Sequence, residues 1–581
     1  MISDALRRRA VELGVDVEYE DVDQVVHDAD EAVVERVVEV LDEDSSRASG
    51  GIVEPIHLDP RRAIRVAGRV DDVELRVGGV PVAVTTETSG SGGDVVGTIS
   101  LPDDLPTGCH ELEVVSDGSS SRCLVVVAPA TMPGADPSEL ASSLFVPAYA
   151  LWESDDPLPS FGHLRSLAEQ LPRHGVDVLA TLPLYATFLD DPFDPSPYSP
   201  ISRLHWNEVY LDDASLPDAP LPTIAAGGEL DWRALAARRR RQLVQAALEA
   251  ADDVVEELAQ FAAAHPDVGS YARFMAERES GGDEVVERSH VLAQYLADAE
   301  LGRISAADGS AALSLDLPIG SHPDGHETWA HPHLFAESMS VGAPPDTFFT
   351  EGQDWGFPPQ LPGAMRSSGY ELWRQMVARA GRHADMLRID HVMAVHRLWW
   401  IPDGAPADRG VYVRYPHDEL LAVIAAEAAA ADVAIVGENL GTVPPAVDAA
   451  LEEWQVLGMH EEQFHLGADR LDAVPPRTVA GVRTHDMAPF ATVEVPEGYR
   501  SLIGADPDEA TLDAVLRRLA ASDAQVVVAD LDDLLDETRP HNLPGRVVPG
   551  IWSRRLDAPL SRTLADERVG RRLRLLERTT R

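Results

Sequence analysis

Apolar and polar positions follow three successive patterns along the chain, and each pattern predicts a different kind of structure. In the first, over residues 1–48, apolar residues such as Val26, Val33 and Val37 recur at helical spacing, while glutamates line another face. This periodicity predicts an acidic, amphipathic helical segment. A run of Ser and Gly, ending at Gly51, then breaks the pattern.

The second pattern, over residues 49–135, is a short alternation of apolar and polar residues between Gly or Asp turns. Stretches such as Val73–Val77 and Leu112–Val115 have the period of two that a half-buried strand requires. Several short strands at this spacing predict a small β-sandwich-like domain. The sequence leaves open whether this domain binds a glycan or packs on its neighbour, although the lack of an obvious aromatic platform favours packing.

The third pattern covers residues 144–581, where apolar runs of strand length alternate with helical stretches. Val176–Leu184 and Ala311–Ile319 are two such runs, and residues 235–300, rich in Ala, Glu and Arg, are typical of helical hairpins. Strands that alternate with helices indicate parallel pairing, and the length suits a (β/α)₈ barrel. The predicted fold class is therefore α/β: a TIM barrel with large insertions, preceded by a helical segment and a β-sandwich-like domain.

Three carboxylates stand at equal intervals in this third region, each at the end of a short strand-like run. They are Asp390, Glu438 and Asp486, and 48 residues separate each from the next. That interval can hold a helix and loops between successive strands. Carboxylates at the C-terminal ends of barrel strands lie on the active-site face, whereas acidic residues are poor strand formers. The pattern predicts a carboxylate-driven reaction on an uncharged substrate.

The neighbours of these carboxylates suggest separate roles. Arg388 lies two residues before Asp390, so on a strand both side chains emerge on one face, and the guanidinium would hold a nucleophilic carboxylate ionised. Glu438, in a partly apolar pocket, would have a raised pKa and could protonate a glycosidic oxygen. His485 beside Asp486 is suited to gripping sugar hydroxyls. A retaining glycosidase needs two carboxyl groups about 5 Å apart. Taken singly, each carboxylate could equally cap a helix.

Composition narrows the class of substrate. Acidic residues number 98 against 48 basic ones, the formal charge is −50, and every basic residue is Arg. This excess predicts adaptation to molar salt, where the Debye length is about 3 Å and self-repulsion is screened; the alternative is an ordinary acidic cytosolic protein. Such a charge disfavours nucleic acid as a partner. A neutral sugar would be indifferent to it.

The chain is expected to be soluble and cytoplasmic, with no membrane partner. Its first residues lack the apolar core of a signal peptide, and no run approaches the roughly 18 apolar residues of a membrane span. Only two cysteines, Cys109 and Cys123, are present, too few for a disulfide framework. Free thiols in a reducing compartment are therefore expected.

Three further features have structural interpretations. The run His322–His326, followed by His331 and His333, has possible metal-ligand spacing, but its Pro and Gly disfavour helical presentation, so no metal and no cofactor are predicted. Trp399 and Trp400 are interpreted as barrel packing. The acids of Asp530–Asp533 are expected to form a solvated helix face, with neighbouring leucines on the apolar side.

Eight short motifs follow one another through the third region. They are Ser196–Tyr198 with Asn207, Asp316–Ile319 with Asp324, Gly342–Asp346, Gly352–Gly356, Arg388–His391, Val436–Gly441, Thr484–Asp486, and Asn542–Gly545 with Trp552. In this order they resemble the amylomaltases, the 4-α-glucanotransferases of glycoside hydrolase family 77. The resemblance covers about residues 144–560, and larger members of that family also have a preceding β-rich domain.

The resemblance implies that Asp390 is the nucleophile, Glu438 the acid/base and Asp486 the transition-state stabiliser. It also implies a set of substrate-binding residues: Arg388, His391, His485, Asp324, Tyr198, Asn207, Phe348 and Trp355. The reaction would transfer a segment of α-1,4-glucan, from malto-oligosaccharides or from starch- or glycogen-derived glucans, to the 4-hydroxyl of an acceptor, with retained configuration. The alternatives are an α-glucan hydrolase and a non-catalytic glycan-binding protein.

Overall fold

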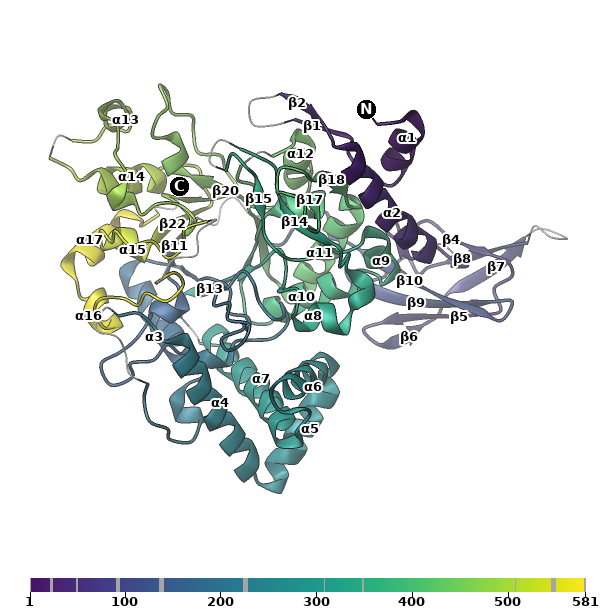
Figure 1. Ribbon diagram of the computed structural model, residues 1–581, viewed down its shortest axis with the longest axis horizontal. Coiled ribbons are helices and arrows are strands. Elements are labelled where there is room, and N and C mark those ends of the chain that lie inside the picture. The colour runs from purple at the N-terminus through teal and green to yellow at the C-terminus, as the bar shows by residue number, and fades with distance from the viewer. Residues whose placement is uncertain are drawn as a thin grey trace.

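A computed structural model describes residues 2–20, 25–48, 51–89, 95–134, 140–222, 228–307, 309–346, 349–441, 443–506, 508–544 and 550–578 (Figure 1). Its centre is an eight-stranded, all-parallel sheet in the order β19-β16-β13-β12-β11-β22-β21-β20. The strands are β11 (Ala141–Phe145), β12 (Val178–Ala180), β13 (Ala312–Leu317), β16 (Met386–Ile389), β19 (Ala434–Gly437), β20 (Gly458–Glu461), β21 (Thr478–Gly481) and β22 (Val526–Asp530). A parallel bridge between Val436 and Leu457 brings the two edges together, so the sheet is a nearly closed barrel.

The barrel strands are buried on both faces, as parallel strands covered by helices must be. Every residue of β19 is buried, and so is every residue of β13 after Ala312. The covering helices include α3 (Phe161–Gln170), α10 (Glu371–Gly381), α11 (His417–Ala431), α12 (Pro445–Trp454), α14 (Thr511–Ala520), α16 (Leu560–Leu564) and α17 (Glu567–Leu575). The predicted fold class, a (β/α)₈ barrel with insertions, is confirmed.

A helical insertion lies between β12 and β13. It consists of α4 (Trp232–Glu249), α5 (Asp252–Ala264), α6 (Pro266–Ser280) and α7 (Glu284–Ser305), which project from one side of the barrel in Figure 1. The Asp283 side chain caps α7 by accepting the N–H groups of Val285 and Val286. The helical hairpins predicted over residues 235–300 are therefore confirmed.

A second insertion forms a four-stranded antiparallel sheet in the order β15-β14-β17-β18. Its strands are β14 (Met339–Ala343), β15 (Gln353–Asp354), β17 (Arg397–Pro402) and β18 (Val411–Arg414). Trp399 and Trp400 lie on β17 and are almost fully buried. Their interpretation as packing residues is correct, but they pack in this inserted sheet and not on a barrel strand.

Two small sheets precede the barrel. One is β3 (Ile56–His57), β10 (Ser119–Val127), β9 (Gly108–Ser116), β5 (Asp72–Val77) and β6 (Val80–Val82), in that order; the other is β4 (Ile64–Ala67), β8 (Val96–Ser100) and β7 (Thr85–Ser89). The two sheets share one hydrophobic core, in which Ile64 and Ile99 meet Leu75 and Leu112. The alternation of buried and exposed residues along β9 is the period of two on which the prediction was based.

The first 48 residues contain α1 (Asp4–Glu12), a hairpin of β1 (Glu18–Glu20) and β2 (Val26–Asp28), and α2 (Glu31–Ala48). The helical interpretation of Val26 was wrong: it lies on β2 and is 62% exposed, because the buried stripe begins only within α2, at Val33. The buried carboxylate of Asp44 caps α9 (Pro362–Ser367), accepting two N–H groups at 2.7 and 2.9 Å, and so joins α2 to the barrel region.

The interpretation of the acids of Asp530–Asp533 as a solvated helix face was wrong. Asp530, Asp532 and Asp533 are at most 5% exposed, because α15 (Leu531–Leu534) is a single turn inside the protein. Arg483 lies 2.9 Å from both Asp530 and Asp533. Asp532 pairs with Arg554 and with His541. Within the described residues, no helix is long and apolar enough to cross a membrane.

Candidate active site

The predicted catalytic carboxylates meet at the C-terminal end of the barrel. Strands β16 and β19 are neighbours, and Ile389 is in register with Gly437. The residues that follow, Asp390 and Glu438, therefore leave adjacent strands at the same level. The side chains of both are about one-sixth exposed, so they are reachable from solvent but largely shielded from it.

Arg388 joins these carboxylates into one cluster. Its Nη2 lies 3.1 Å from Asp390 Oδ1 and 3.1 Å from Glu438 Oε2. Its Nη1 donates to both oxygens of Asp316, at 2.6 and 2.7 Å. Asp316 is in register with Arg388 on the adjoining strand β13, which explains the close pairing. One cation therefore contacts three carboxyl groups that come from neighbouring strands.

The two carboxyl groups at the centre of this cluster differ in proton affinity. Burial, the charge of Glu438 and a hydrogen bond to it raise the pKa of Asp390 well above its ordinary value. Burial opposes ionisation of Glu438 too, but Arg388 and the His391 N–H, which donates at 2.7 Å, outweigh it and lower the pKa of Glu438 to about 2. Both directions are the reverse of the expectation from sequence, which gave Glu438 the raised pKa.

An aromatic group borders the carboxylates on the side of β11 and β13. The Tyr198 hydroxyl donates to Asp316 Oδ2 at 2.6 Å, and its ring stacks on His485, with centroids 4.8 Å apart. The centroid of the Trp552 ring lies 6.0 Å from the ring centroids of both Tyr198 and His485. On another side, the half-buried Trp355 meets the His391 ring edge-on at 5.1 Å. Such surfaces are suited to contact with the C–H faces of sugars.

Asp486 is the most exposed of the three carboxylates, with 42% of its side chain accessible. It accepts a hydrogen bond from Asn542 Nδ2 at 2.5 Å and lies 3.2 Å from His485 Nε2. The residue before Asn542 is His541, which contacts Asp532 at 3.0 Å and the Tyr149 hydroxyl at 2.8 Å. The buried ionic network below the site therefore anchors the segment that holds Asp486 in place.

Some residues assigned by resemblance lie apart from this cluster. Asp324 is on an exposed loop, where its N–H donates to His322 Nδ1. The buried side chain of Asn207 caps a short 3₁₀ turn and donates to Thr187 Oγ1 at 3.2 Å. Phe348 falls outside the described residues. The structure thus brings together Arg388, Asp390, His391, Glu438, Tyr198, His485, Asp486 and Trp355.

Sequence reasoning assigned no site role to Asp316 or Asn542, although both lie in the motifs quoted above. The position of Asp316 near the end of an apolar run was a usable signal, since that is the feature that marked the other carboxylates. The histidine run that begins at His322 forms no metal cluster. The described residues contain no group of three His, Cys, Asp or Glu side chains placed to hold an ion. His326 instead contacts Ser270 Oγ at 3.0 Å.

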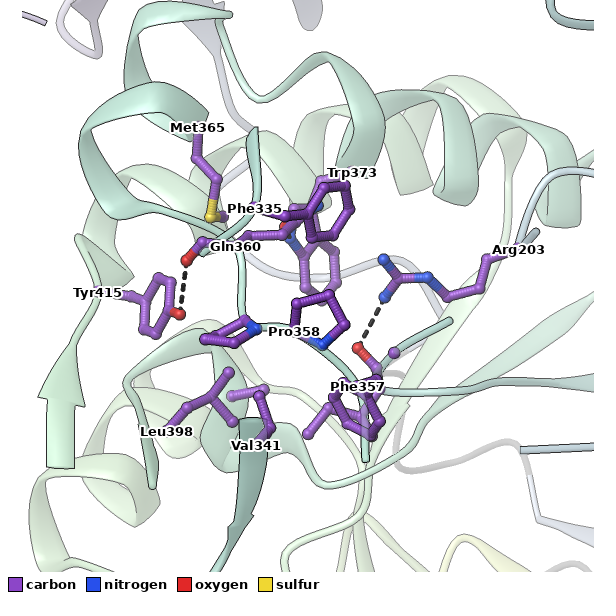
Figure 2. Close-up of a pocket in the computed structure, with 14 residues that line it drawn as sticks. Arg203, Phe335, Val341, Phe357, Pro358, Gln360, Met365, Trp373, Leu398 and Tyr415 are labelled. Atoms are coloured by element: carbon purple, nitrogen blue, oxygen red, sulfur yellow. Dashed lines mark hydrogen bonds between the residues drawn. The ribbon is translucent and has the colours of Figure 1, made fainter. Parts of the chain in front are cut away.

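A cavity of about 30 Å³ lies away from the carboxylates, between the inserted sheet and the helices α9 and α10 (Figure 2). Its wall is mostly apolar, with Val341 and Leu398 on the sheet side. Trp373 and Tyr415 hydrogen-bond to Gln360 along its edge. This volume holds one or two water molecules and is too small for a sugar. This cavity is therefore not a candidate sugar-binding site.

Comparison with known proteins finds relatives that belong to one family. A family model for glycoside hydrolase family 77, described as 4-alpha-glucanotransferase, matches residues 147–288 and 283–561. The 4-alpha-glucanotransferase of Mycobacterium tuberculosis strain H37Rv is 29% identical over 552 residues, covering 77% of this chain and 75% of that protein. The enzyme of the same name from Haemophilus influenzae is 25% identical, covering 84% and 79% of the two chains.

Two solved structures share the fold. The amylomaltase of Corynebacterium glutamicum superposes with a TM-score of 0.85 at 21% identity, covering 99% of both chains. The amylomaltase of Streptococcus agalactiae, solved in complex with acarbose, gives a TM-score of 0.67 at 23% identity and covers 75% of this chain and 98% of its own. Because both structures are less than 25% identical to this chain, they establish its fold alone. The family is established by the match to the family model.

Proposed function

Because this chain belongs to glycoside hydrolase family 77, the 4-α-glucanotransferases, we propose that it transfers segments of α-1,4-glucan between malto-oligosaccharides by a retaining double displacement. The proposed mechanism is based on one observation. Arg388 contacts both Asp390 and Glu438 at the C-terminal end of two adjacent strands. Two carboxyl groups held this close fit a retaining reaction, in which one attacks the sugar and the other handles the proton.

In the proposed first step, Asp390 attacks the anomeric carbon while Glu438 protonates the departing glycosidic oxygen. The pKa of Asp390 is raised and that of Glu438 is lowered, so this step requires the two preferences to be exchanged when the donor binds. A donor sugar lying between the two groups would break their hydrogen bond and leave Asp390 beside the Arg388 cation. That cation favours the ionised form of Asp390, and the freed proton passes to Glu438.

In the proposed second step, Glu438 removes a proton from the 4-hydroxyl of an acceptor glucan, which displaces Asp390 and restores the α configuration. Asp486, held by Asn542 and His485, would bind sugar hydroxyls while positive charge develops on the ring. Trp355 beside His391 offers an aromatic contact for the acceptor. An acceptor that fills this space would also limit the access of water to the covalent intermediate, which favours transfer over hydrolysis.

The test of this function is incubation with maltotriose, with products resolved by chain length and free glucose followed. A transferase yields longer oligosaccharides together with glucose, and the number of reducing ends stays constant. A hydrolase yields only shorter products, with one new reducing end for each bond cleaved. Binding of maltotriose without any product would instead favour a non-catalytic glycan-binding protein.

We also propose that the protein works in a cytoplasm of high salt. The support is the formal charge of −50, carried by a chain without lysine. Folding and activity are expected in about 3 M KCl and are expected to be lost on dilution to roughly 0.1 M, since screening of acidic self-repulsion falls with ionic strength. Circular dichroism and maltotriose turnover across this range measure the effect, with glycerol as a non-ionic control. Full folding and activity in dilute buffer would contradict salt adaptation.

We also propose that the chain is divided into a helical segment, 1–48, a β-sandwich-like domain, 49–135, and a catalytic barrel, 144–581. In this proposal the second of these domains packs on the barrel. That role is supported by β9 and β10, which pack on the barrel helix α11. At this contact the half-buried thiol of Cys109 lies near the ion pair of Arg374 with Glu427, whose charged atoms are 2.9 Å apart. Binding of a glycan by residues 49–135 is the alternative.

A further inference from the structure

Glu461 is a buried carboxyl group that the proposed mechanism does not use. It is the last residue of β20 and only 2% exposed. On one side β20 pairs with β21, where Glu461 is in register with Gly481. On the other side, a bridge joins Leu457, the residue before β20, to Val436 of β19, the strand that Glu438 follows. Glu461 therefore lies in the barrel wall between two charged groups. One is Arg388 with its carboxylates, and the other is the buried Arg483 with Asp530 and Asp533.

The carboxyl group of Glu461 fits into the barrel wall, but one of its oxygens lacks a hydrogen-bond partner among the described residues. Glu461 Oε2 is fully buried and has no hydrogen-bond partner in the described part of the chain. The residue opposite is Gly481, where an added Cβ would lie 2.8 Å from that oxygen. A side chain at position 481 would therefore make the carboxyl group shift from this place. A buried, ionised carboxylate in this position would be strongly disfavoured.

Four charged groups on neighbouring elements face Glu461: Arg388 on β16, Glu438 after β19, Arg483 after β21, and Asp533 on α15. Both cations are already engaged, Arg388 with Asp316, Asp390 and Glu438, and Arg483 with Asp530 and Asp533. On its own segment, His460 and Glu462 pair with each other at 3.0 Å. No cation is thus left over for Glu461 among these groups. Burial, together with the charges of Glu438 and Asp533, raises its pKa to about 8 despite the two arginines.

We propose that Glu461 is a positioning residue whose neutral carboxyl group leaves Arg388 to the catalytic pair, and whose ionisation in alkaline solution lowers activity. The inference rests on the proposed function. Ionised Glu461 would draw Arg388 away from Asp390 and Glu438 and would repel the latter. The contact that holds the two catalytic carboxyl groups together would therefore weaken as the pH rises.

The test is the pH profile of kcat for maltotriose disproportionation, measured between pH 6 and 10. In the wild type, kcat is expected to fall roughly tenfold between about pH 7 and about pH 9, as one group ionises. Glu461→Gln, which keeps a neutral group of the same shape, is expected to hold wild-type kcat at about pH 7 within twofold and to lose less than half of it by about pH 9. If the variant loses activity over the same range as the wild type, the alkaline limb belongs to the catalytic pair and the proposal fails.

The matched control is Glu300→Gln. Glu300 is also buried and has its pKa raised by burial, to about 7, but it lies on α7 and binds the Asp212 N–H and the Ser215 hydroxyl. Its removal is expected to leave the activity profile unchanged. A control variant that also flattened the alkaline limb would show that the limb reports a general property of the fold and would overturn the assignment to Glu461.

A second measurement separates this inference from the proposed function. The pKa of Glu461 rises from its ordinary value of 4.5 on folding, so its contribution to stability is present below that value and is lost as the pH rises to about 8. The Tm of Glu461→Gln minus that of the wild type should therefore be near zero at low pH, grow across this range and then stay constant. A difference that does not change with pH, or a variant that cannot fold, would contradict a neutral Glu461 even if the chain proved to have no transferase activity.

Discussion

Asp390→Asn is expected to lower kcat by about four orders of magnitude or more without lowering stability. The amide cannot form the covalent ester with the anomeric carbon, so the double displacement is blocked at its first step. Burial and the charge of Glu438 already oppose ionisation of Asp390, so a neutral side chain of the same shape is compatible with the site. Turnover of maltotriose and the thermal unfolding transition, both measured in molar KCl, check the two halves of this prediction.

The roles of the two carboxyl groups can be separated with an activated donor. With α-maltosyl fluoride, the leaving group needs no proton, so Glu438→Ala should still form the covalent intermediate, and added azide should give the retained α-azide. Asp390→Ala lacks the nucleophile, so azide should attack directly and give the inverted β-azide. The opposite pairing of products would exchange the two roles, in accord with the raised pKa of Asp390. Identical products from both variants would rule out a nucleophilic role for either group.

Much of the barrel follows from local pattern. The strands that end just before Asp390 and Glu438 are short apolar runs. The interval between them holds the helix α11 with its loops, together with β17 and β18 of the inserted sheet. Arg388 and Asp390 share a face because of the period of two along a strand. These features depend on residues close together in sequence, so the sequence alone could place them.

The features that the sequence did not provide depend on contacts between distant segments. Asp316 joins the site through its register with Arg388, 72 residues away, and strand register cannot be inferred from one strand alone. The pKa of Glu438 is lowered by Arg388 and also by the His391 N–H, which donates to Glu438 from a residue with a left-handed backbone conformation, with φ of 45°. A residue of this type adopts that conformation rarely enough that a single sequence gives no warning.

The segment Asp530–Asp533 shows how a local pattern can mislead. Acids interleaved with leucines are typical of a surface helix, yet this turn is enclosed because residues from distant segments cover it. Arg483 comes from the segment after β21, and Arg554 and His541 come from the C-terminal region. Pairing with these cations makes the burial of three carboxylates tolerable.

Replacing Arg483 with methionine is therefore expected to be among the most damaging single changes to the fold. The guanidinium side chain is 2% exposed and lies 2.9 Å from carboxylate oxygens of both Asp530 and Asp533. Methionine fills a similar volume but leaves two buried carboxyl groups without their cation, at a cost of about 3–5 kcal/mol in the free energy of unfolding. Urea denaturation in molar KCl measures this change. The exposed pair of Arg470 with Asp472 supplies the control, since Arg470→Met should leave the transition in place.

The pH dependence of this loss distinguishes charge from packing. Burial already raises the pKa of Asp533 to about 7 and raises that of Asp530, even with Arg483 present. Without the arginine both pKa values rise further, so folding of the variant takes up protons, and its stability falls as the pH increases from about 5 to about 8. The difference between wild type and variant should be small at the acid end, where both carboxyl groups are neutral, and largest at the alkaline end. A difference that is constant with pH would mean that Arg483 stabilises the barrel through the contacts of its side-chain stem and not through its charge.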